Sequence, residues 1–386
     1  MTTLALFCKV VDNYGDIGIC YRLARQLTEE HNVSVSLWVD DLQSFQRICP
    51  EIDTNLIKQQ VHHINVRQWT DQNQHYSADD DVADIVVEFF GCNIPPSYID
   101  AMKVRAIKPV WINLEGLTAE DWVEGCHRLP SPQQSLTKYF FYPGFTRQTG
   151  GLIIEAGLME QRQQFQQDRS AAAHFLRQFG LTDAELLSTK VSLFCYPFAP
   201  VNELFKVWKK RSSNITCLIP EGVAPDATRA FLGKRAARGM SATQGSLTVH
   251  ILPFLPQQDY DKLLWSCDIN FVRGEDSFVR AQWAARPFIW HIYPQDNNLH
   301  QVKLKAFLSR YTSKTASLSD LTLAWNAVLD VPDNLPLLWE RLLSDQQKIA
   351  KLLPEWESKL LINGDFSSNL LKFAATINPE IALNKL

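Results

Sequence analysis

The chain has 386 residues, a formal net charge of −4 and a hydrophobic content of 46%. This length exceeds the usual size of one domain and predicts two, each with its own core. The mildly acidic balance argues against nucleic-acid binding through phosphate neutralisation, and no apolar run reaches the length of a membrane span. The eight cysteines are scattered without disulfide or metal spacing and the N-terminus does not resemble a leader, which together predict a reduced cytoplasmic protein.

Apolar runs alternate with helical stretches through the first half, which predicts a doubly wound, mostly parallel sheet. The expected strands are 4–11, 33–39, 61–66, 85–90, 110–114 and 139–142, and the expected helices include 19–30, 42–48 and 96–106. Three aspartates at 79–81 lie in a polar stretch before a strand. A solvated loop explains them better than a metal site.

A polar helical stretch at 159–179 predicts a connector, and a second α/β series follows it. Its expected strands are 191–195, 215–219, 248–252, 269–272 and 288–291, and the chain ends in helices expected at 321–329, 336–361 and 366–377. We expect the last helix to return to the first domain. The predicted domains are therefore 1–155 with 366–386, and 185–362, joined by a connector at 156–184.

A glycine-containing loop, DNYGDIG at 12–18, follows the first expected strand. It has glycines at 15 and 18 but lacks the full Gly-x-Gly-x-x-Gly spacing of a dinucleotide-binding fingerprint, which argues against a nicotinamide oxidoreductase. Two carboxylates, Asp12 and Asp16, stand instead at the strand's carboxyl end, where ligands of open α/β sheets bind. They are candidates for a working pair. The alternatives are a turn residue for Asp12 and a helix N-cap for Asp16.

A second loop, RGEDSF at 273–278, follows a buried strand of the second half. Gly274 breaks the chain, and Asp276 or Ser277 is suited to cap the next helix. The first amides of that helix form an anion site that suits a diphosphate. Glu275 is suited to bind sugar hydroxyls. The alternative is a capping box with solvated charges.

Neighbouring strand ends of the second half add charge and aromatic rings. Arg273 supplies a positive charge, and the run HIYPQDN at 291–297 adds polar groups. Phe194 lies at the end of one further strand, and Phe254 follows another. Rings at this edge are suited to stack on a planar base, and each alone is also compatible with a core position. The histidines show no ligand spacing, so we predict no metal site.

These loops resemble segments of the EarP family, the protein-arginine rhamnosyltransferases that modify bacterial translation elongation factor P. The segments that carry the resemblance are VVDNYGDIG at 10–18, WINLE at 111–115, SLFCY at 192–196, LPFLPQ at 252–257, FVRGEDSF at 271–278, QW at 282–283 and YPQ at 293–295. The resemblance implies a GT-B glycosyltransferase, with two Rossmann-like domains facing across a cleft. It implies a protein acceptor on the first domain and dTDP-β-L-rhamnose on the second, with inversion and without a metal or other cofactor.

The resemblance also implies roles for individual residues. We expect Asp16 to orient or deprotonate the acceptor arginine, Asp12 to hold its guanidinium, and Glu275 to fix donor hydroxyls. The donor contacts that it implies are Tyr14, Gly15, Phe194, Tyr196, Phe254, Gln257, Arg273, Glu275, Asp276, Ser277 and Tyr293.

Two other functions remain open. The first is a GT-B glycosyltransferase with another nucleotide sugar or acceptor, which a basic or amphipathic membrane-facing surface would favour. The second is a non-catalytic protein that binds a nucleotide or docks on a translation factor. The presence of intact Asp12, Asp16 and Glu275 argues against lost catalysis and so against this second function.

Overall fold

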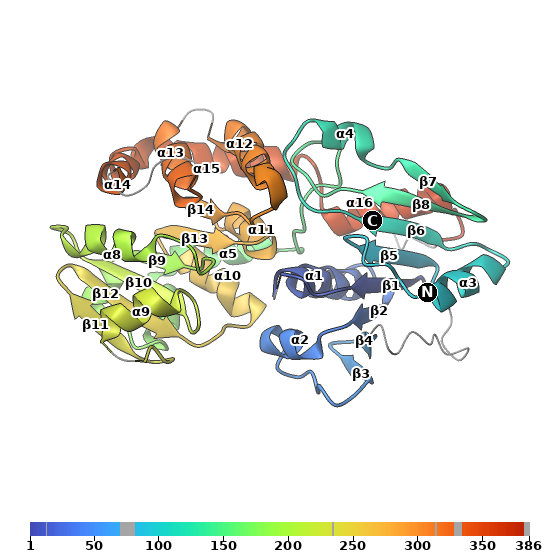
Figure 1. Ribbon diagram of the computed structural model, residues 1–386, viewed down its shortest axis with the longest axis horizontal. Helices are drawn as coiled ribbons and strands as arrows, with labels where there is room; N and C mark the ends of the chain where they lie inside the picture. The colour runs from blue at the N-terminus through green and yellow to red at the C-terminus, as the bar shows by residue number, and fades with distance from the viewer. Residues whose placement is uncertain (13, 70–81, 234, 313–314, 328–333, 382–386) are drawn as a thin grey trace. The chain divides into compact units, whose positions relative to one another are not determined.

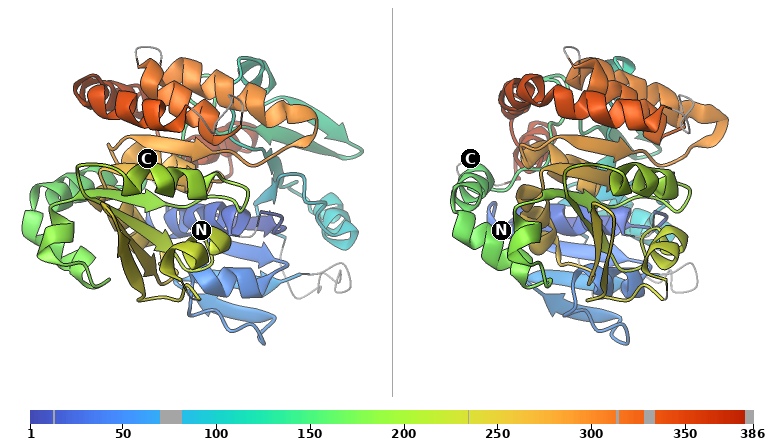
Figure 2. Two further views of the ribbon diagram at one scale, coloured as in Figure 1. Left: turned by 60° about the vertical axis from the view of Figure 1, so that its left-hand side comes forward. Right: turned by 90° about the vertical axis from the view of Figure 1, so that its left-hand side faces the viewer.

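The computed structural model describes residues 1–12, 14–69, 82–233, 235–312, 315–327 and 334–381. They form two compact units: unit 1 is Met1–Ala156 with Lys359–Leu386, and unit 2 is Gly157–Ser358. Each unit contains one sheet flanked by helices (Figure 1, Figure 2). The aspartates at 79–81 lie outside the described residues. None of the described helices has the length and apolar character of a membrane span.

Unit 1 contains an eight-stranded sheet in the order β3-β4-β2-β1-β5-β6-β8-β7. Its strands are β1 (Thr3–Cys8), β2 (Ser34–Val39), β3 (Lys58–Val61), β4 (Ile64–Gln68), β5 (Ile85–Phe89), β6 (Val110–Leu114), β7 (Pro130–Gln133) and β8 (Leu136–Phe141). The pairs from β4 to β8 are parallel, and β3 and β7 add antiparallel edges. Every residue of β5 and β6 is buried, as expected for parallel strands covered on both faces.

The helices of unit 1 are α1 (Gly15–Glu29), α2 (Leu42–Ile48), α3 (Pro96–Val104), α4 (Trp122–Cys126) and α16 (Phe366–Ile377). α1 packs against β1, β2 and α16. In α16, the rings of Phe366 and Phe373 lie 5.4 and 5.6 Å from the ring of Phe141 in β8. The last helix therefore belongs to unit 1, which confirms that it returns to the first domain (Figure 1).

Unit 2 contains a six-stranded sheet in the order β11-β12-β10-β9-β13-β14. Its strands are β9 (Thr189–Leu193), β10 (Ile215–Pro220), β11 (Ser241–Gln244), β12 (Leu247–Leu252), β13 (Ile269–Arg273) and β14 (Phe288–His291). All pairs are parallel except β11 with β12. The two doubly wound, mostly parallel sheets expected from the sequence are confirmed.

The helices of unit 2 follow the same alternation and then run consecutively to the end of the unit. They are α5 (Leu158–Gln167), α6 (Arg169–Arg177), α7 (Asp183–Leu186), α8 (Val201–Lys209), α9 (Pro225–Leu232), α10 (Gln257–Ser266), α11 (Asp276–Trp283), η1 (Asp296–Asn298), α12 (Leu299–Tyr311), α13 (Ala316–Trp325), α14 (Leu335–Ser344) and α15 (Gln346–Leu361). The last of these, α15, carries the chain back into unit 1.

Each sheet has one point at which the strand order reverses. In unit 1, β1 lies between β2 and β5, and in unit 2, β9 lies between β10 and β13. Connections leave the central strand toward opposite sides there, which opens a crevice at the carboxyl ends. The loop after β1 and the loop after β13 each border this reversal in their own sheet.

The structure corrects several predicted boundaries. The first strand ends at Cys8 rather than at residue 11, and the first helix begins at Gly15 rather than at residue 19. The strand expected at 61–66 is a hairpin, because His62 and His63 turn the chain with φ of +49° and +63°. The helix expected at 336–361 is two helices, α14 and α15, separated at Asp345.

Candidate functional site

Asp16 fastens the loop of unit 1 to the helix that follows it. Its Oδ2 accepts hydrogen bonds from the backbone N–H groups of Val11 (2.7 Å) and Asp12 (2.8 Å), and the residue is only 5% exposed. Amide donors of this kind stabilise negative charge on a carboxylate. The N-cap alternative for Asp16 is wrong, because Tyr14 occupies the N-cap position and Asp16 lies in the first turn of α1.

Asp12 is half-buried in the same loop, at a turn closed by the N–H of Gly15 donating to the Asp12 carbonyl at 2.7 Å. A Cβ on Gly15 would stand 3.0 Å from Oδ2 of Asp12, so the glycine leaves room for this carboxylate. The N–H of Val10 donates to Oδ1 of Asp40, 2.8 Å away, at the end of β2. Three aspartates therefore give the loop an acidic character.

The ends of β5 and β6 contribute residues that the sequence analysis missed. Phe90 follows β5 with φ of +52° and is 39% exposed, an uncommon backbone conformation for an aromatic residue. Gly91 donates its N–H to Oδ1 of Asn113 at 2.9 Å, and Nδ2 of Asn113 donates to Glu115. The WINLE segment gave a signal for Asn113 and Glu115, whereas nothing in the sequence pointed to Phe90.

In unit 2, Arg273 joins the end of β13 to the end of β9. Its guanidinium carbon lies 4.5 Å from the ring centre of Phe194 and 4.8 Å from that of Tyr196, and Nη1 donates to the carbonyl of Cys195 at 3.4 Å. Cation–π contacts of this length are favourable. The structure therefore brings together three predicted donor residues that lie about 80 positions apart in the sequence.

The turn after Arg273 depends on glycine and serine. Gly274 adopts φ of +64°, and its carbonyl accepts the indole N–H of Trp290 at 2.8 Å. Oγ of Ser277 accepts the N–H of Arg273 at 3.1 Å and donates to its carbonyl. The prediction that Asp276 or Ser277 caps α11 is wrong, because the N-cap residue is Glu275 and its side chain makes no capping bond.

Two carboxylates flank the start of α11. Oε1 of Glu275 pairs with Nζ of Lys303 at 2.9 Å, and Oδ2 of Asp276 is 3.5 Å from Nε2 of Gln257. Gln257 and Asp276 were both predicted donor contacts, and the structure places them side by side. Lys303 was missed, since it lies 28 residues beyond its partner and no local pattern marks it.

An aromatic cluster continues along the carboxyl edge of β9 and β14. Tyr196 is stacked on Phe198 with ring centres 5.7 Å apart and planes at 4°, and Tyr293 meets Tyr196 edge-on at 5.7 Å. Phe198 is 60% exposed and was missed, although it lies two residues after Tyr196. The remaining predicted donor residues lie elsewhere: Phe254 is half-buried in the loop between β12 and α10, and Tyr14 and Gly15 belong to unit 1.

His291 is a buried, neutral residue that contacts this cluster. Its Nδ1 accepts the N–H of Tyr196 at 3.2 Å. Burial, reinforced by the nearby Arg273, lowers the pKa of His291 to about 3. The imidazole is therefore uncharged near neutrality and serves as an acceptor rather than as a cation.

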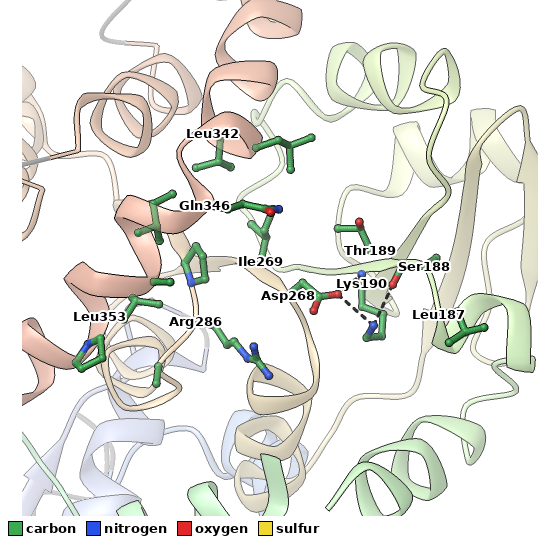
Figure 3. Close-up of a pocket in the computed structure, with 16 residues that line it drawn as sticks. Leu187, Ser188, Thr189, Lys190, Asp268, Ile269, Arg286, Leu342, Gln346 and Leu353 are labelled. Carbon is green, nitrogen blue, oxygen red and sulfur yellow. Dashed lines mark hydrogen bonds and ion pairs between the residues drawn. The ribbon is translucent and has the colours of Figure 1, made fainter. Parts of the chain in front are cut away.

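Among the described residues, no group of three or more His, Cys, Asp or Glu side chains is placed to hold a metal ion. A cavity of about 560 Å³ exists in unit 2 at the amino ends of β9 and β13, between Thr189, Ile269, Arg286 and the helix residues Leu342 and Leu353 (Figure 3). Ligands of open α/β sheets bind at the other, carboxyl edge. We therefore place the candidate site at the loops and not in this cavity.

Comparison with known proteins agrees with this geometry. A family model described as the elongation factor P (EF-P) rhamnosyltransferase EarP matches residues 4–375. The chain belongs to the EarP family. A protein-arginine rhamnosyltransferase from Pseudomonas putida is 46% identical over 338 residues, which cover 85% of this chain and 88% of that relative. Family membership confirms the predicted enzyme class.

Solved structures place this EarP-family chain among glycosyltransferases. A structure described as the basis of EarP-mediated arginine glycosylation of EF-P covers 97% of this chain and 99% of that one, at 29% identity and a TM-score of 0.67. The spinosyn rhamnosyltransferase SpnG, complexed with thymidine diphosphate, covers 96% of this chain and 99% of its own at 9% identity and a TM-score of 0.51. The second likeness concerns the fold alone. Together they confirm the predicted GT-B fold.

Proposed function

We propose that this chain transfers rhamnose from dTDP-β-L-rhamnose to an arginine side chain of elongation factor P, with inversion at the anomeric carbon. The observation that carries the proposal is the placement of Arg273 against Phe194 and Tyr196 at the strand reversal of unit 2, in a chain that belongs to the EarP family. We further propose that the reaction takes place in the cytoplasm and that it needs neither a metal nor another cofactor.

The donor half of the proposal uses the carboxyl edge of unit 2. Aromatic rings such as Phe194 and Phe254 offer flat surfaces for thymine, because stacking tolerates any planar base. The amides at the start of α11 and the guanidinium of Arg273 receive the diphosphate, whose charge increases as the sugar leaves. Glu275 holds hydroxyl groups of the donor.

The acceptor half uses the acidic loop of unit 1. An arginine guanidinium is a weak nucleophile, since its charge is delocalised and its pKa is above about 12. Asp16, fixed by the amides of Val11 and Asp12, orients one guanidinium nitrogen and receives its proton, while Asp12 holds the rest of the fork. The nitrogen bonds to the anomeric carbon as the bond from that carbon to the diphosphate oxygen breaks.

The test is to incubate the purified chain with dTDP-β-L-rhamnose and elongation factor P and to measure the intact mass of the factor. We expect a gain of one deoxyhexose, located on a single arginine by fragmentation. Reactions without donor and with a UDP-hexose serve as controls. Transfer from the UDP-hexose alone would favour the other glycosyltransferase activity, and binding of the donor without any transfer would favour a non-catalytic protein.

A further inference from the structure

Glu275 is held by a lysine from a separate helix. Nζ of Lys303, in α12, lies 2.9 Å from Oε1 of Glu275, and the two side chains are only 14% and 20% exposed. Partly buried pairs are less screened by salt than surface pairs. This ion pair is therefore a stable feature of the carboxyl edge of unit 2, where we propose that the donor binds.

The face of α12 that carries Lys303 is anchored in the core. Phe307, one turn further along α12, packs edge-on against Phe278 of α11 at 4.7 Å and against Trp290 of β14 at 5.7 Å. Residues four apart lie on the same side of a helix. Core packing thus brings the ammonium group to the start of α11, where Glu275 is the N-cap residue.

A carboxylate at this position needs a counter-charge. The start of α11 attracts anions through its amides, and an unpaired carboxylate there would repel a bound diphosphate. We propose that Lys303 is a positioning residue of the donor site, which fixes Glu275 toward the donor hydroxyls and cancels its charge beside the diphosphate. This inference rests on the proposed function, because that function supplies the donor.

The proposal predicts a characteristic pattern in the affinity for dTDP, which has the diphosphate but lacks the sugar. Lys303→Met removes the ammonium group that faces Glu275, so this lysine no longer balances the charge of the carboxylate, and we expect dTDP to bind about tenfold more weakly. Glu275→Gln removes a negative charge while Lys303 keeps its positive charge, so this variant should bind dTDP at least as tightly as wild type does, but should bind dTDP-β-L-rhamnose more weakly relative to dTDP. The double variant should bind dTDP better than Lys303→Met does, because the carboxylate that repels the diphosphate has been removed as well.

Titration calorimetry measures the affinities of the wild type and of the three variants for dTDP and for dTDP-β-L-rhamnose. Lys305→Met is the matched control, since Lys305 is exposed on the same helix, and it should leave both affinities unchanged. Lys303→Arg should retain most of the affinity. The defect of Lys303→Met should also shrink at high salt, because charge repulsion is screened. Thermal melting checks that each variant is folded.

Two results would overturn the inference while leaving the proposed function intact. The first is wild-type affinity for dTDP in Lys303→Met, and the second is a double variant that binds dTDP no better than Lys303→Met. In the second case the lysine would act on the diphosphate itself. If the wild-type chain does not bind dTDP at all, the donor assignment fails and this inference fails with it.

Discussion

The loops that follow β1 and β13 both border the strand reversal of their own sheet, β1 as its central strand and β13 as the neighbour of the central strand β9, but the two loops differ in charge. The loop of unit 1 contains Asp12 and Asp16 and is tied to Asp40. The loop of unit 2 presents the guanidinium of Arg273, and its Glu275 is paired with Lys303. A strand-to-helix junction beside the reversal is thus suited to a cation in unit 1 and to an anion in unit 2.

The two loops are also stabilised in different ways. In unit 1, a carboxylate in the first turn of the helix accepts the amides of Val11 and Asp12, so the acid itself maintains the loop. In unit 2, the Ser277 hydroxyl bonds to the backbone of Arg273 and leaves the carboxylates to other partners. Removing the Asp16 side chain would therefore act on both the shape of the loop and its chemistry, whereas replacing it by an amide changes the charge alone.

The largest effect is expected for Asp16→Asn. The Asn oxygen still accepts the two loop amides, so the variant loses the charge while it keeps the hydrogen bonds. Transfer of rhamnose should fall by a factor of about 100 or more, with donor affinity unchanged. Rates come from the mass assay and affinities from calorimetry. Asp100→Asn on the exposed side of α3 is the control, and loss of donor affinity in step with activity would contradict the assignment.

The second prediction compares the buried His291 of unit 2 with the half-buried His127 of unit 1. Nδ1 of His127 accepts the N–H of Tyr142 at 3.0 Å, as His291 accepts that of Tyr196. Burial, with Arg128 nearby, lowers the pKa of His127 to about 4. The unfolded chain binds protons at both histidines below about pH 6.5. Stability should therefore fall as the pH drops from 6.5 toward 3 for His291 and toward 4 for His127.

His291→Asn tests this, because an Asn oxygen can still accept the N–H of Tyr196. Between pH 7 and pH 5 the variant should lose about 2 kcal/mol less stability than wild type, since one proton contributes at most about 1.4 kcal/mol per pH unit. Urea unfolding at several pH values measures the difference. His174→Asn, at an exposed position of α6, should behave as wild type, and equal pH slopes for all three proteins would contradict the prediction.

The third prediction compares the effects of alanine at Gly274 and at Gly15 on stability and on activity. Gly274→Ala places a side chain at φ of +64° and should destabilise unit 2 by about 1–2 kcal/mol, measured by urea unfolding. Gly15 is the first residue of α1. Because alanine favours helices, Gly15→Ala should not destabilise the fold. Its Cβ displaces the Asp12 carboxylate, so transfer should slow several-fold. Equal effects of both variants on stability would remove this distinction.

The smallest effect is expected for Phe254→Ala. Loss of one stacking surface should weaken binding of dTDP by about fivefold, at the lower end of the range for aromatic–base contacts. Phe179→Ala, which removes an aromatic ring from the packing between α6 and α10, is a control that should alter stability and not affinity. If Phe254→Ala binds dTDP as wild type does, the ring of Phe254 serves packing and does not contact the donor.

Much of the fold was predictable because it is encoded locally. Buried parallel strands such as β5 and β13 are mostly apolar runs, and glycine with acidic residues marks the loops that follow β1 and β13. Short edge strands such as β7 and β11 were missed, since they carry polar residues and four positions give no clear period. The break at Asp168 between α5 and α6 was missed for a similar reason, as one capping side chain decides it.

The sequence by itself determined two α/β halves, the family and the loops that carry Asp16 and Glu275. Only the tertiary structure decided which groups these side chains bond: the amides of Val11 and Asp12 for Asp16, and Lys303 for Glu275. Strand order explains the difference, because β9 pairs with β13 and so brings Phe194 to Arg273 across a long stretch of chain. Periodicity specifies an element from its own residues, whereas a contact between elements depends on how the whole sheet is ordered.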